Sequence, residues 1–204
     1  MQKALCLFLL GSFFATTFIS CMSSQQMMDR LNGHFYKYTF AIREATTRKK
    51  STTYNNNAFT ITFDPEYSRV NFKIANHTSS SIKIIWNETY IKVQDDSSKV
   101  IHANIPYSTK NNTLQPSEIE AGSSLQDIII PVDYIKNENG KWVERNFYPE
   151  TDQSNSQNTD WIMGLLGVDV FKLYLPIQIN EQTQVYTFTF YPIEMEKGAK
   201  SFKH

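Results

Sequence analysis

A cysteine close to the start of the 204-residue chain has the clearest chemistry in the sequence. Cys21 follows an apolar run from Ala4 to Phe18, and Lys3 with the α-amine places positive charge before that run. A short positive region, an apolar run and a cleavage point make up an export signal. The run is shorter than the ~20 apolar residues that span a bilayer. We therefore expect it to be removed, which leaves the Cys21 thiol at the new N-terminus.

The residues beside this cysteine indicate what happens to its thiol. Phe18-Ile19-Ser20-Cys21 resembles the bacterial lipobox, Leu-Ala/Ser-Gly/Ala-Cys, with departures at the first and third places. The resemblance implies cleavage before Cys21, a diacylglycerol on its sulfur and an acylated amine. Two or three acyl chains hold a protein on a membrane, because each buried CH₂ contributes about 0.8 kcal/mol. The alternative is an ordinary secretory signal cut after Ser23, which discards Cys21.

Cysteine usage agrees with lipidation. The chain has 2 cysteines, and Cys6 lies within the apolar run, so removal of residues 1–20 leaves Cys21 without an intramolecular disulfide partner. Exported proteins meet oxidising conditions in which a free thiol is unusual, and acylation would occupy it. We expect a protein anchored by lipid in the cell envelope, at the outer membrane.

The rest of the sequence carries no recognisable reaction centre. There is no HxH or HExxH spacing, no GxSxG elbow and no Gly-rich phosphate loop. We expect His102 to be a hydrogen-bonded strand residue, and we predict no catalytic residue, no metal site, no cofactor and no enzyme activity. The histidines considered for metal-ligand spacing are His34, His77, His102 and His204.

Carboxylates and asparagines offer weaker candidates. A glycosidase needs two carboxylates about 5 to 9.5 Å apart, but no local pattern singles out a pair. Acidic turns at Asp95-Asp96 and at Asp64 with Glu66 lack the alternating ligands of a calcium loop. Three N-x-S/T triplets are chance in a bacterium and would mark surface loops in a eukaryotic secretory protein. The carboxylates are Asp127, Asp133, Glu144 and Glu150, and the triplets begin at Asn76, Asn87 and Asn111.

The aromatic residues have the most functional interest. The chain has 11 tyrosines, 14 phenylalanines and 3 tryptophans, and exposed aromatic rings stack on sugars or pack against partner proteins. We name Trp142, which follows an Asn-Gly turn, and Trp161, beside the polar stretch 149–160, as candidate ligand-binding residues. Trp86 is expected in the core, and the alternative is that all three fill it.

Period-two alternation predicts strands along most of the chain. Asn139-Gly140 favours a type I′ turn and therefore a hairpin with Trp142 on its return strand. Prolines 131, 176 and 192 indicate strand ends or edge strands, because proline cannot donate to a ladder. The expected strands cover 35–42, 59–63, 70–76, 82–93, 99–105, 125–135, 132–145 as a hairpin, 170–179 and 184–193.

These elements predict an all-β protein, an immunoglobulin-like antiparallel β-sandwich, with a closed barrel as the rival architecture. Residues 67–135, with the pair at 168–191, resemble the immunoglobulin-like accessory domains of water-stress and FxLYD type. They also resemble lipoproteins common in Bacteroidetes. The resemblance implies a fold and a location but no reaction. We divide the chain into signal peptide 1–20, polar tether 21–33, sandwich 34–193 and basic tail 194–204.

Charge narrows the classes of partner. Removal of Lys3 with the signal leaves 19 basic and 20 acidic residues, so no overall field attracts nucleic acid, and we expect none as a partner. Two functions remain open. The first is a membrane-tethered, non-catalytic binding or assembly module that meets an envelope protein. The second is a surface glycan-binding protein that uses Trp142 and Trp161.

Overall fold

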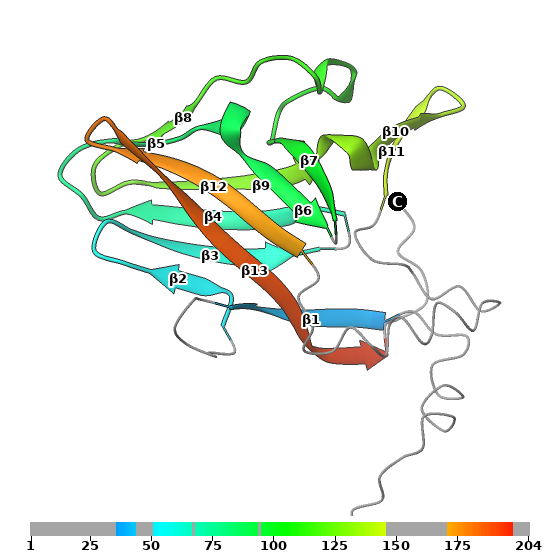
Figure 1. Ribbon diagram of the computed structural model, residues 1–204, viewed down its shortest axis with the longest axis horizontal. Helices are drawn as coiled ribbons and strands as arrows, with labels where there is room; N and C mark the ends of the chain where they lie inside the picture. Colours follow the sequence, from blue (N-terminus) through cyan, green and yellow to red (C-terminus); the bar gives the residue numbers. More distant parts are fainter. Residues whose placement is uncertain (1–35, 44–50, 67, 94, 146–170, 198–204) are drawn as a thin grey trace, which may run out of the picture.

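The computed structural model describes residues 36–43, 51–66, 68–93, 95–145 and 171–197. Within these ranges the chain is almost entirely β-structure with antiparallel pairing throughout, which confirms the expected all-β sandwich (Figure 1). The elements are β1 (Tyr36–Arg43), β2 (Thr53–Asn55), β3 (Phe59–Pro65), β4 (Val70–Asn76), β5 (Ile82–Ile84), the 3₁₀ helix η1 (Trp86–Glu88), β6 (Tyr90–Val93), β7 (Asp96–Ile101), η2 (Tyr107–Thr109), β8 (Ser117–Ile119), β9 (Ser124–Pro131), η3 (Val132–Tyr134), β10 (Ile135–Glu138), β11 (Lys141–Glu144), β12 (Phe171–Ile179) and β13 (Gln182–Lys197).

Two layers form the sandwich. The first has the order β1-β13-β12-β6-β7, with β5 and β8 beside the far end of β12, and the second has the order β9-β4-β3-β2. Pairing of Val100 with Pro131 and of Ile101 with Ile130 joins the layers at one edge. At the other edge the Ile42 N–H donates to the carbonyl of Ser51, just before β2 (2.8 Å). Both edges are thus bridged, and the sandwich approaches a closed barrel with few unpaired strand edges.

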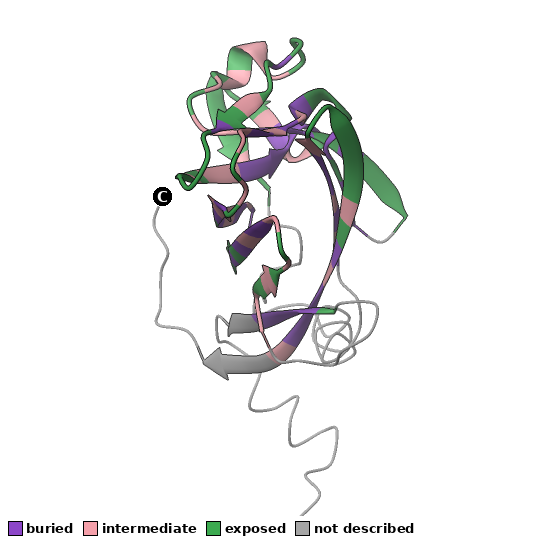
Figure 2. Cartoon of the chain, turned by 90° about the vertical axis from the view of Figure 1, so that its left-hand side faces the viewer, coloured by how far each residue is buried: buried purple, intermediate pink, exposed green. Residues whose placement is uncertain are grey.

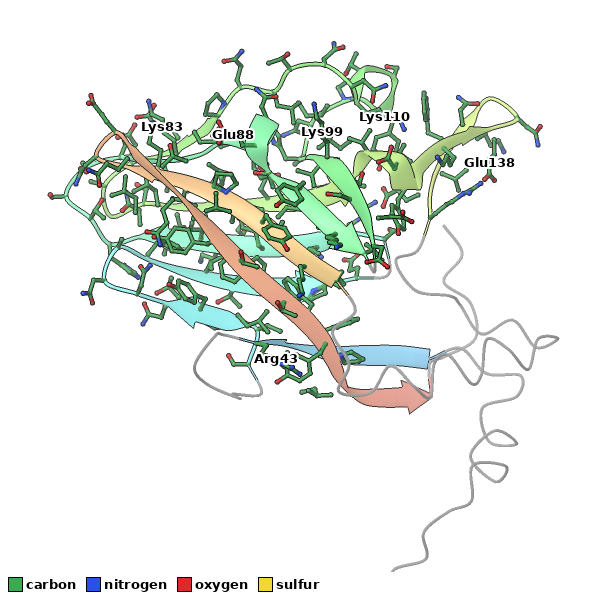
Figure 3. All side chains as sticks on the ribbon, viewed as in Figure 1. Arg43, Lys83, Glu88, Lys99, Lys110 and Glu138 are labelled. Atoms are coloured by element: carbon green, nitrogen blue, oxygen red, sulfur yellow. The ribbon has the colours of Figure 1, made fainter. Side chains whose placement is uncertain are left out.

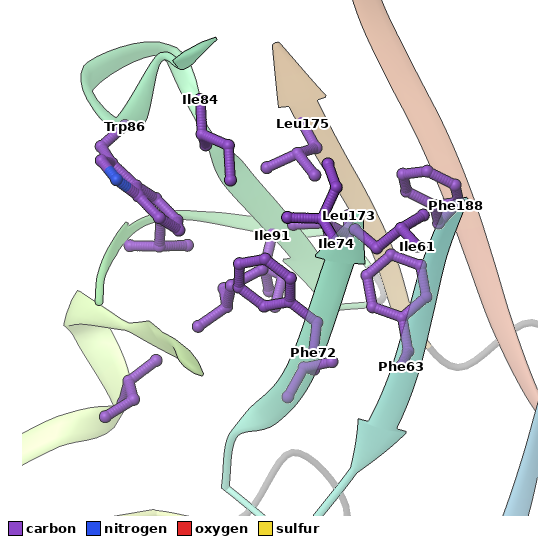
Figure 4. Close-up of a cluster of buried hydrophobic side chains, with 14 of the residues drawn as sticks. Ile61, Phe63, Phe72, Ile74, Ile84, Trp86, Ile91, Leu173, Leu175 and Phe188 are labelled. Atoms are coloured by element: carbon purple, nitrogen blue, oxygen red, sulfur yellow. The ribbon is translucent and has the colours of Figure 1, made fainter. Parts of the chain in front are cut away.

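Alternating side chains fill the space between the layers. Phe59, Ile61 and Phe63 of β3 are all buried, as the period-two pattern predicts. They meet β13 from the opposite layer, where the rings of Phe63 and Phe188 lie 4.8 Å apart at 60° (Figure 4). Burying a side chain of this size contributes about 1.5 to 3 kcal/mol. Along β13, exposed residues at the start give way to buried residues further on (Figure 2).

The segment 82–93, expected as one strand, is interrupted at Trp86. The chain leaves β5, makes one turn of 3₁₀ helix and resumes as β6, and both strands pair with β12. The break accommodates Pro176. The Pro176 carbonyl accepts a hydrogen bond from the Ile85 N–H (3.0 Å). Because the nitrogen and the carbonyl of a strand residue point to the same side, the Pro176 nitrogen, which has no hydrogen to donate, faces the gap between β5 and β6.

The expectation that Pro176 marks a strand edge or end is therefore wrong, since β12 has strands on both sides. Pro131 does end β9, as expected. Pro192 lies at an irregularity in the β1–β13 pairing, between Thr39 and Phe40, where the register shifts. Bulges are among the few places where a sheet accepts proline.

Two hairpins follow local turn chemistry. Asn139 and Gly140 have φ values of 53° and 82°, and Glu138 pairs with Lys141, which confirms the predicted type I′ hairpin. The β12–β13 turn consists of Asn180 and Glu181, with φ values of 49° and 64°. Gln182 already belongs to β13, because it pairs with Ile179.

Several expectations fall outside the described residues. These are the signal peptide and tether with Cys21, the polar stretch 149–160 with Glu150, and Trp161. At the C-terminal end, β13 continues past the expected sandwich boundary at 193 because it pairs with β1 as far as Tyr36 opposite Lys197. No described helix has the length and apolar character needed to cross a membrane.

Candidate functional site

The β10–β11 hairpin forms a two-stranded sheet of its own and projects from the sandwich (Figure 1). Trp142 and Val143 are neighbours on its return strand and are 42% and 39% exposed. Successive strand residues point to opposite faces, so each face of the hairpin presents an apolar side chain to solvent. An isolated two-stranded hairpin is only marginally stable in water. Its shape therefore depends on contacts at its base.

Glu144 supplies the main contact at this base. Its carboxylate accepts hydrogen bonds from the Ser68 hydroxyl (2.6 Å), from Nε (3.1 Å) and Nη2 of Arg69, and from the Tyr107 hydroxyl. The Glu144 side chain is only 9% exposed. A bidentate pair of a carboxylate and a guanidinium is among the stronger polar contacts in proteins. The network ties the end of β11 to the residues before β4 and to η2.

These contacts shift the pKa of both acids. Burial by itself would raise the pKa of the Glu144 carboxyl, but hydrogen bonds from Ser68 and Tyr107 and the charge of Arg69 outweigh it and lower that pKa. Burial, together with the hydrogen bond to Glu144 and its negative charge, raises the pKa of Tyr107 to about 12. At neutral pH the network holds an ionised carboxylate and a neutral phenol, which keeps each donor of the network opposite a charged acceptor.

Two further contacts hold the other side of the base. The Arg145 N–H donates to the carbonyl of Tyr134 (2.8 Å), and Nζ of Lys110 donates to the carbonyls of Val132 (2.6 Å) and Ile135 (2.7 Å). Burial, followed by the nearby positive charge of Lys136, lowers the pKa of the Lys110 amine. The hairpin is thus tied to the sandwich through η2, η3 and the start of β4.

The three tryptophans differ in where the structure places them. The indole of Trp142 meets the ring of Tyr107 edge-to-face, with centroids 6.4 Å apart at 79°, and keeps the rest of its surface exposed. Trp86 lies in the core, as expected, with 1% exposure and a hydrogen bond from Nε1 to the Ser117 hydroxyl (2.7 Å). Trp161 lies outside the described ranges. Of the two candidate ligand-binding residues, Trp142 is therefore the one that the structure places.

His102 is hydrogen-bonded, as expected, although it follows β7 rather than lying within it. Its Nδ1 lies 3.1 Å from Oδ2 of Asp127, and its ring stacks on Trp86 with centroids 4.5 Å apart. The other carboxylate oxygen of Asp127 accepts from the N–H groups of Ala103 and Ile128, both at 2.8 Å. These contacts join the end of β7 to β9.

The other candidate carboxylates that the structure describes lie in separate hydrogen-bond environments. Asp127 and Glu144 have entirely different hydrogen-bond partners, and Asp133 is exposed. Asp95 pairs with Lys92 (3.7 Å), and Glu66 accepts from Asn71 (2.7 Å). Across the part of the chain that the structure describes, no three His, Cys, Asp or Glu residues gather closely enough to hold a metal ion.

Two of the three asparagine triplets begin with structural residues. Asn76 is 1% exposed, and its Nδ2 donates to the carbonyls of Ser80 (2.8 Å) and Ile119 (3.0 Å). Asn87 exchanges hydrogen bonds with the backbone of Leu114, at 2.7 and 2.8 Å. Asn76 is therefore a buried residue that holds the backbone, and its triplet does not mark an exposed position at Asn76 itself.

The network around Glu144 was not foreseen as a unit. From the sequence, Glu144 is only a possible catalytic carboxylate, and no pattern near Ser68 or Arg69 points to it. The one usable signal was the terminal position of Glu144 on a well-defined hairpin. A hairpin without its own core must be attached at that position.

Comparisons with known proteins add little. No family model matches the sequence, and no match was found among curated proteins. Among solved structures the chain is similar to the yjhA protein from Bacillus subtilis, with 16% identity over 71% of this chain and 95% of that one. The TM-score of 0.23 is too low to support an argument about fold or function.

Proposed function

We propose that the protein is a membrane-tethered, non-catalytic binding module of the cell envelope, and that it meets a protein partner through the β10–β11 hairpin. The observation that carries this proposal is the exposure of Trp142 and Val143 on a hairpin whose base is fixed by Glu144. Exposed tryptophans on rigid supports are typical anchors of protein interfaces.

The geometry favours binding in two ways. The hairpin is already held in one conformation, so little conformational entropy is lost when a partner binds. Among the described strands, β10 and β11 pair only with each other, so each has an outer edge to which a partner strand can add. Strand addition uses backbone hydrogen bonds for affinity and pockets for side chains such as Trp142 for specificity.

The tether rests on Cys21 and on its resemblance to the lipobox. We infer an acylated Cys21 at the N-terminus of the mature protein and attachment to the outer membrane. Mass spectrometry of the N-terminal peptide from native material tests this directly. A diacylglycerol on Cys21 supports the proposal, provided that Cys21→Ser lacks this modification and is no longer recovered in the membrane fraction. An unmodified N-terminus beyond residue 21 contradicts it.

A photo-crosslinking experiment tests the hairpin. A photoreactive amino acid at position 143 is expected to give one discrete adduct in intact cells, and Trp142→Ala should remove it. Val185 is a matched control, because it is an aliphatic strand residue that is 53% exposed on β13. The same adduct from positions 143 and 185, or an adduct from 143 that survives Trp142→Ala, would refute the hairpin contact.

The exposed ring of Trp142 also favours a second function, recognition of a surface glycan, because sugars stack on exposed indoles. Trp161 belongs to this hypothesis too. A glycan array probed with the purified protein separates the two functions. If the protein binds a neutral sugar and Trp142→Ala abolishes that binding, glycan recognition is supported. If the array gives no signal and the discrete crosslink is found, binding of a protein partner is supported.

A further inference from the structure

The outer face of the first sheet carries two rows of side chains whose placement follows from the strand register. One row crosses β7, β6, β12 and β13, and the next row runs parallel to it. Four strands at ~4.8 Å separation make each row about 14 Å long. Figure 3 looks onto this sheet, with Lys99 labelled on β7. We refer to these residues as the lysine–tyrosine face: Lys99, Tyr90, Tyr174 and Thr187 in the first row, and Ser97, Lys92, Lys172 and Thr189 in the second.

Two lysines of this face lie directly opposite each other. Lys92 on β6 pairs in register with Lys172 on β12. Like charges in that relationship destabilise a sheet. Lys92 has one carboxylate nearby, that of Asp95 at 3.7 Å, which is fully exposed and screened by solvent. In the described part of the chain no carboxylate pairs with Lys172 or Lys99. Apart from Asp95, no carboxylate among the described residues neutralises the positive charge of this face.

Two tyrosines lie beside these lysines. Tyr90 and Tyr174 are cross-strand partners whose rings stack with centroids 4.3 Å apart at 11°, and Tyr90 is 36% exposed. Lys99 pairs with Tyr90 from the other side. Each ring covers one face of the other, so the pair is a fixed platform rather than a slot that a ligand can enter. Hydroxyl groups of Ser97, Thr187 and Thr189 surround it.

We propose that the lysine–tyrosine face binds an acidic polysaccharide. The lysines supply charge complementarity to carboxylate or phosphate groups on sugars, and the five hydroxyl-bearing side chains supply donors and acceptors for sugar hydroxyls. A lipid surface fits less well, because neither row contains an aliphatic side chain to enter the bilayer. A nucleic acid fits less well too, because Tyr90 and Tyr174 cover one face of each other and leave less aromatic surface on which bases can stack. This surface is distinct from the hairpin and does not depend on it.

Calorimetric titration of the purified protein in a non-ionic detergent tests the proposal. The probes are polygalacturonate, neutral dextran, oligothymidylate and micelles of the same detergent with phosphatidylglycerol. Polygalacturonate is expected to bind, more weakly as salt rises, and dextran is not. The double variant Lys92→Gln/Lys172→Gln should bind polygalacturonate about tenfold more weakly, as the loss of two exposed charge contacts predicts. Exposed lysines outside this face provide the matched control, Lys73→Gln/Lys141→Gln, which should bind unchanged.

Folding is checked within the same set of variants. Lys172→Glu replaces a like-charge pair with an opposite-charge pair, so it should raise the melting temperature while weakening binding. Trp142→Ala should leave polygalacturonate binding unchanged, which separates this proposal from the hairpin contact. Equal weakening by the control pair, full binding by Lys172→Glu, or a stronger response to dextran, oligothymidylate or phosphatidylglycerol micelles would overturn the proposal.

Discussion

Arg69 and Glu144 lie 75 positions apart in the sequence and form a bidentate ion pair, in which Nε and Nη2 of the guanidinium both donate to the carboxylate. The pair joins the residues before β4 to the end of β11. It converts a two-stranded hairpin without a core into a fixed projection of the sandwich. The pair thereby holds the strand that carries the exposed Trp142.

Removal of the Glu144 carboxylate is expected to loosen the hairpin base. Glu144→Ala leaves the Arg69 guanidinium and the Ser68 hydroxyl without their acceptor, so the free energy of unfolding should fall by about 2 kcal/mol. Denaturant unfolding measures this change. The control is Glu138→Ala, which removes an exposed ion pair with Arg145 (3.3 Å) and should cost less than about 0.5 kcal/mol. Equal losses in the two variants would contradict a structural role for Glu144.

The Tyr107 phenol is expected to titrate far above its ordinary range. Its pKa is raised from 10.0 to about 12 by burial and by the Glu144 carboxylate. A raised pKa in the folded state means that the stabilisation is fully present below pH 10 and is lost as pH rises toward 12. In an ultraviolet titration, Tyr107→Phe should lose absorbance change above the ordinary tyrosine transition and not within it. The wild-type protein and Tyr107→Phe should also differ less in free energy of unfolding as pH rises from 10 toward 12. A Tyr107 transition at pH 10 would contradict the network.

The lowered pKa of Glu144 predicts an opposite dependence at acid pH. A depressed pKa stabilises the folded state above the unfolded value of about 4.3, and this stabilisation is lost as pH falls through the lower folded value. The stability difference between the wild-type protein and Glu144→Gln should therefore be constant near neutrality and shrink below about pH 4. Denaturant unfolding across this range measures it. A difference that grows on acidification would show the opposite sign of the shift.

The two described tryptophans should differ sharply in their effect on stability. Trp86 is fully buried and Trp142 is 42% exposed. Trp86→Ala should lower the free energy of unfolding by about 3 to 5 kcal/mol, and Trp142→Ala by less than about 1 kcal/mol. Thermal or chemical denaturation distinguishes them. A large loss in Trp142→Ala would mean that its ring serves mainly to pack the hairpin and is not kept for a partner.

Asn76 is expected to be among the most sensitive polar residues. Its Nδ2 donates to the carbonyls of Ser80 in the loop after β4, of Ile119 at the end of β8 and of Glu120, and Asn76→Ala removes all three hydrogen bonds. The expected loss is about 3 kcal/mol. Asn111→Ala, at an exposed position in another N-x-S/T triplet, should change stability by less than about 0.5 kcal/mol. Similar small losses in both would contradict the structural role of Asn76.

Much of the local structure could be predicted from the sequence because it depends on local rules. Phe59, Ile61 and Phe63 alternate with polar residues, and a strand places such residues on one buried face. Asn139-Gly140 tolerates positive φ at both turn positions, so its hairpin follows from two residues. Where the local rule was applied without knowledge of the neighbouring strand, as at Pro176, the prediction was wrong.

The sequence by itself therefore determined most of the longer strands, the apolar face of each and the place of the tight turn, because these depend on side chains within a few residues of one another. It did not reveal the short strands β2 and β8, which pair with strands that the sequence does not place beside them. Only the tertiary structure decided that Lys92 lies opposite Lys172, that Arg69 meets Glu144 and that Pro176 faces a gap. Alternation specifies the face that a strand buries but not the strand beside it. Neighbours and register are settled by packing of the whole sandwich.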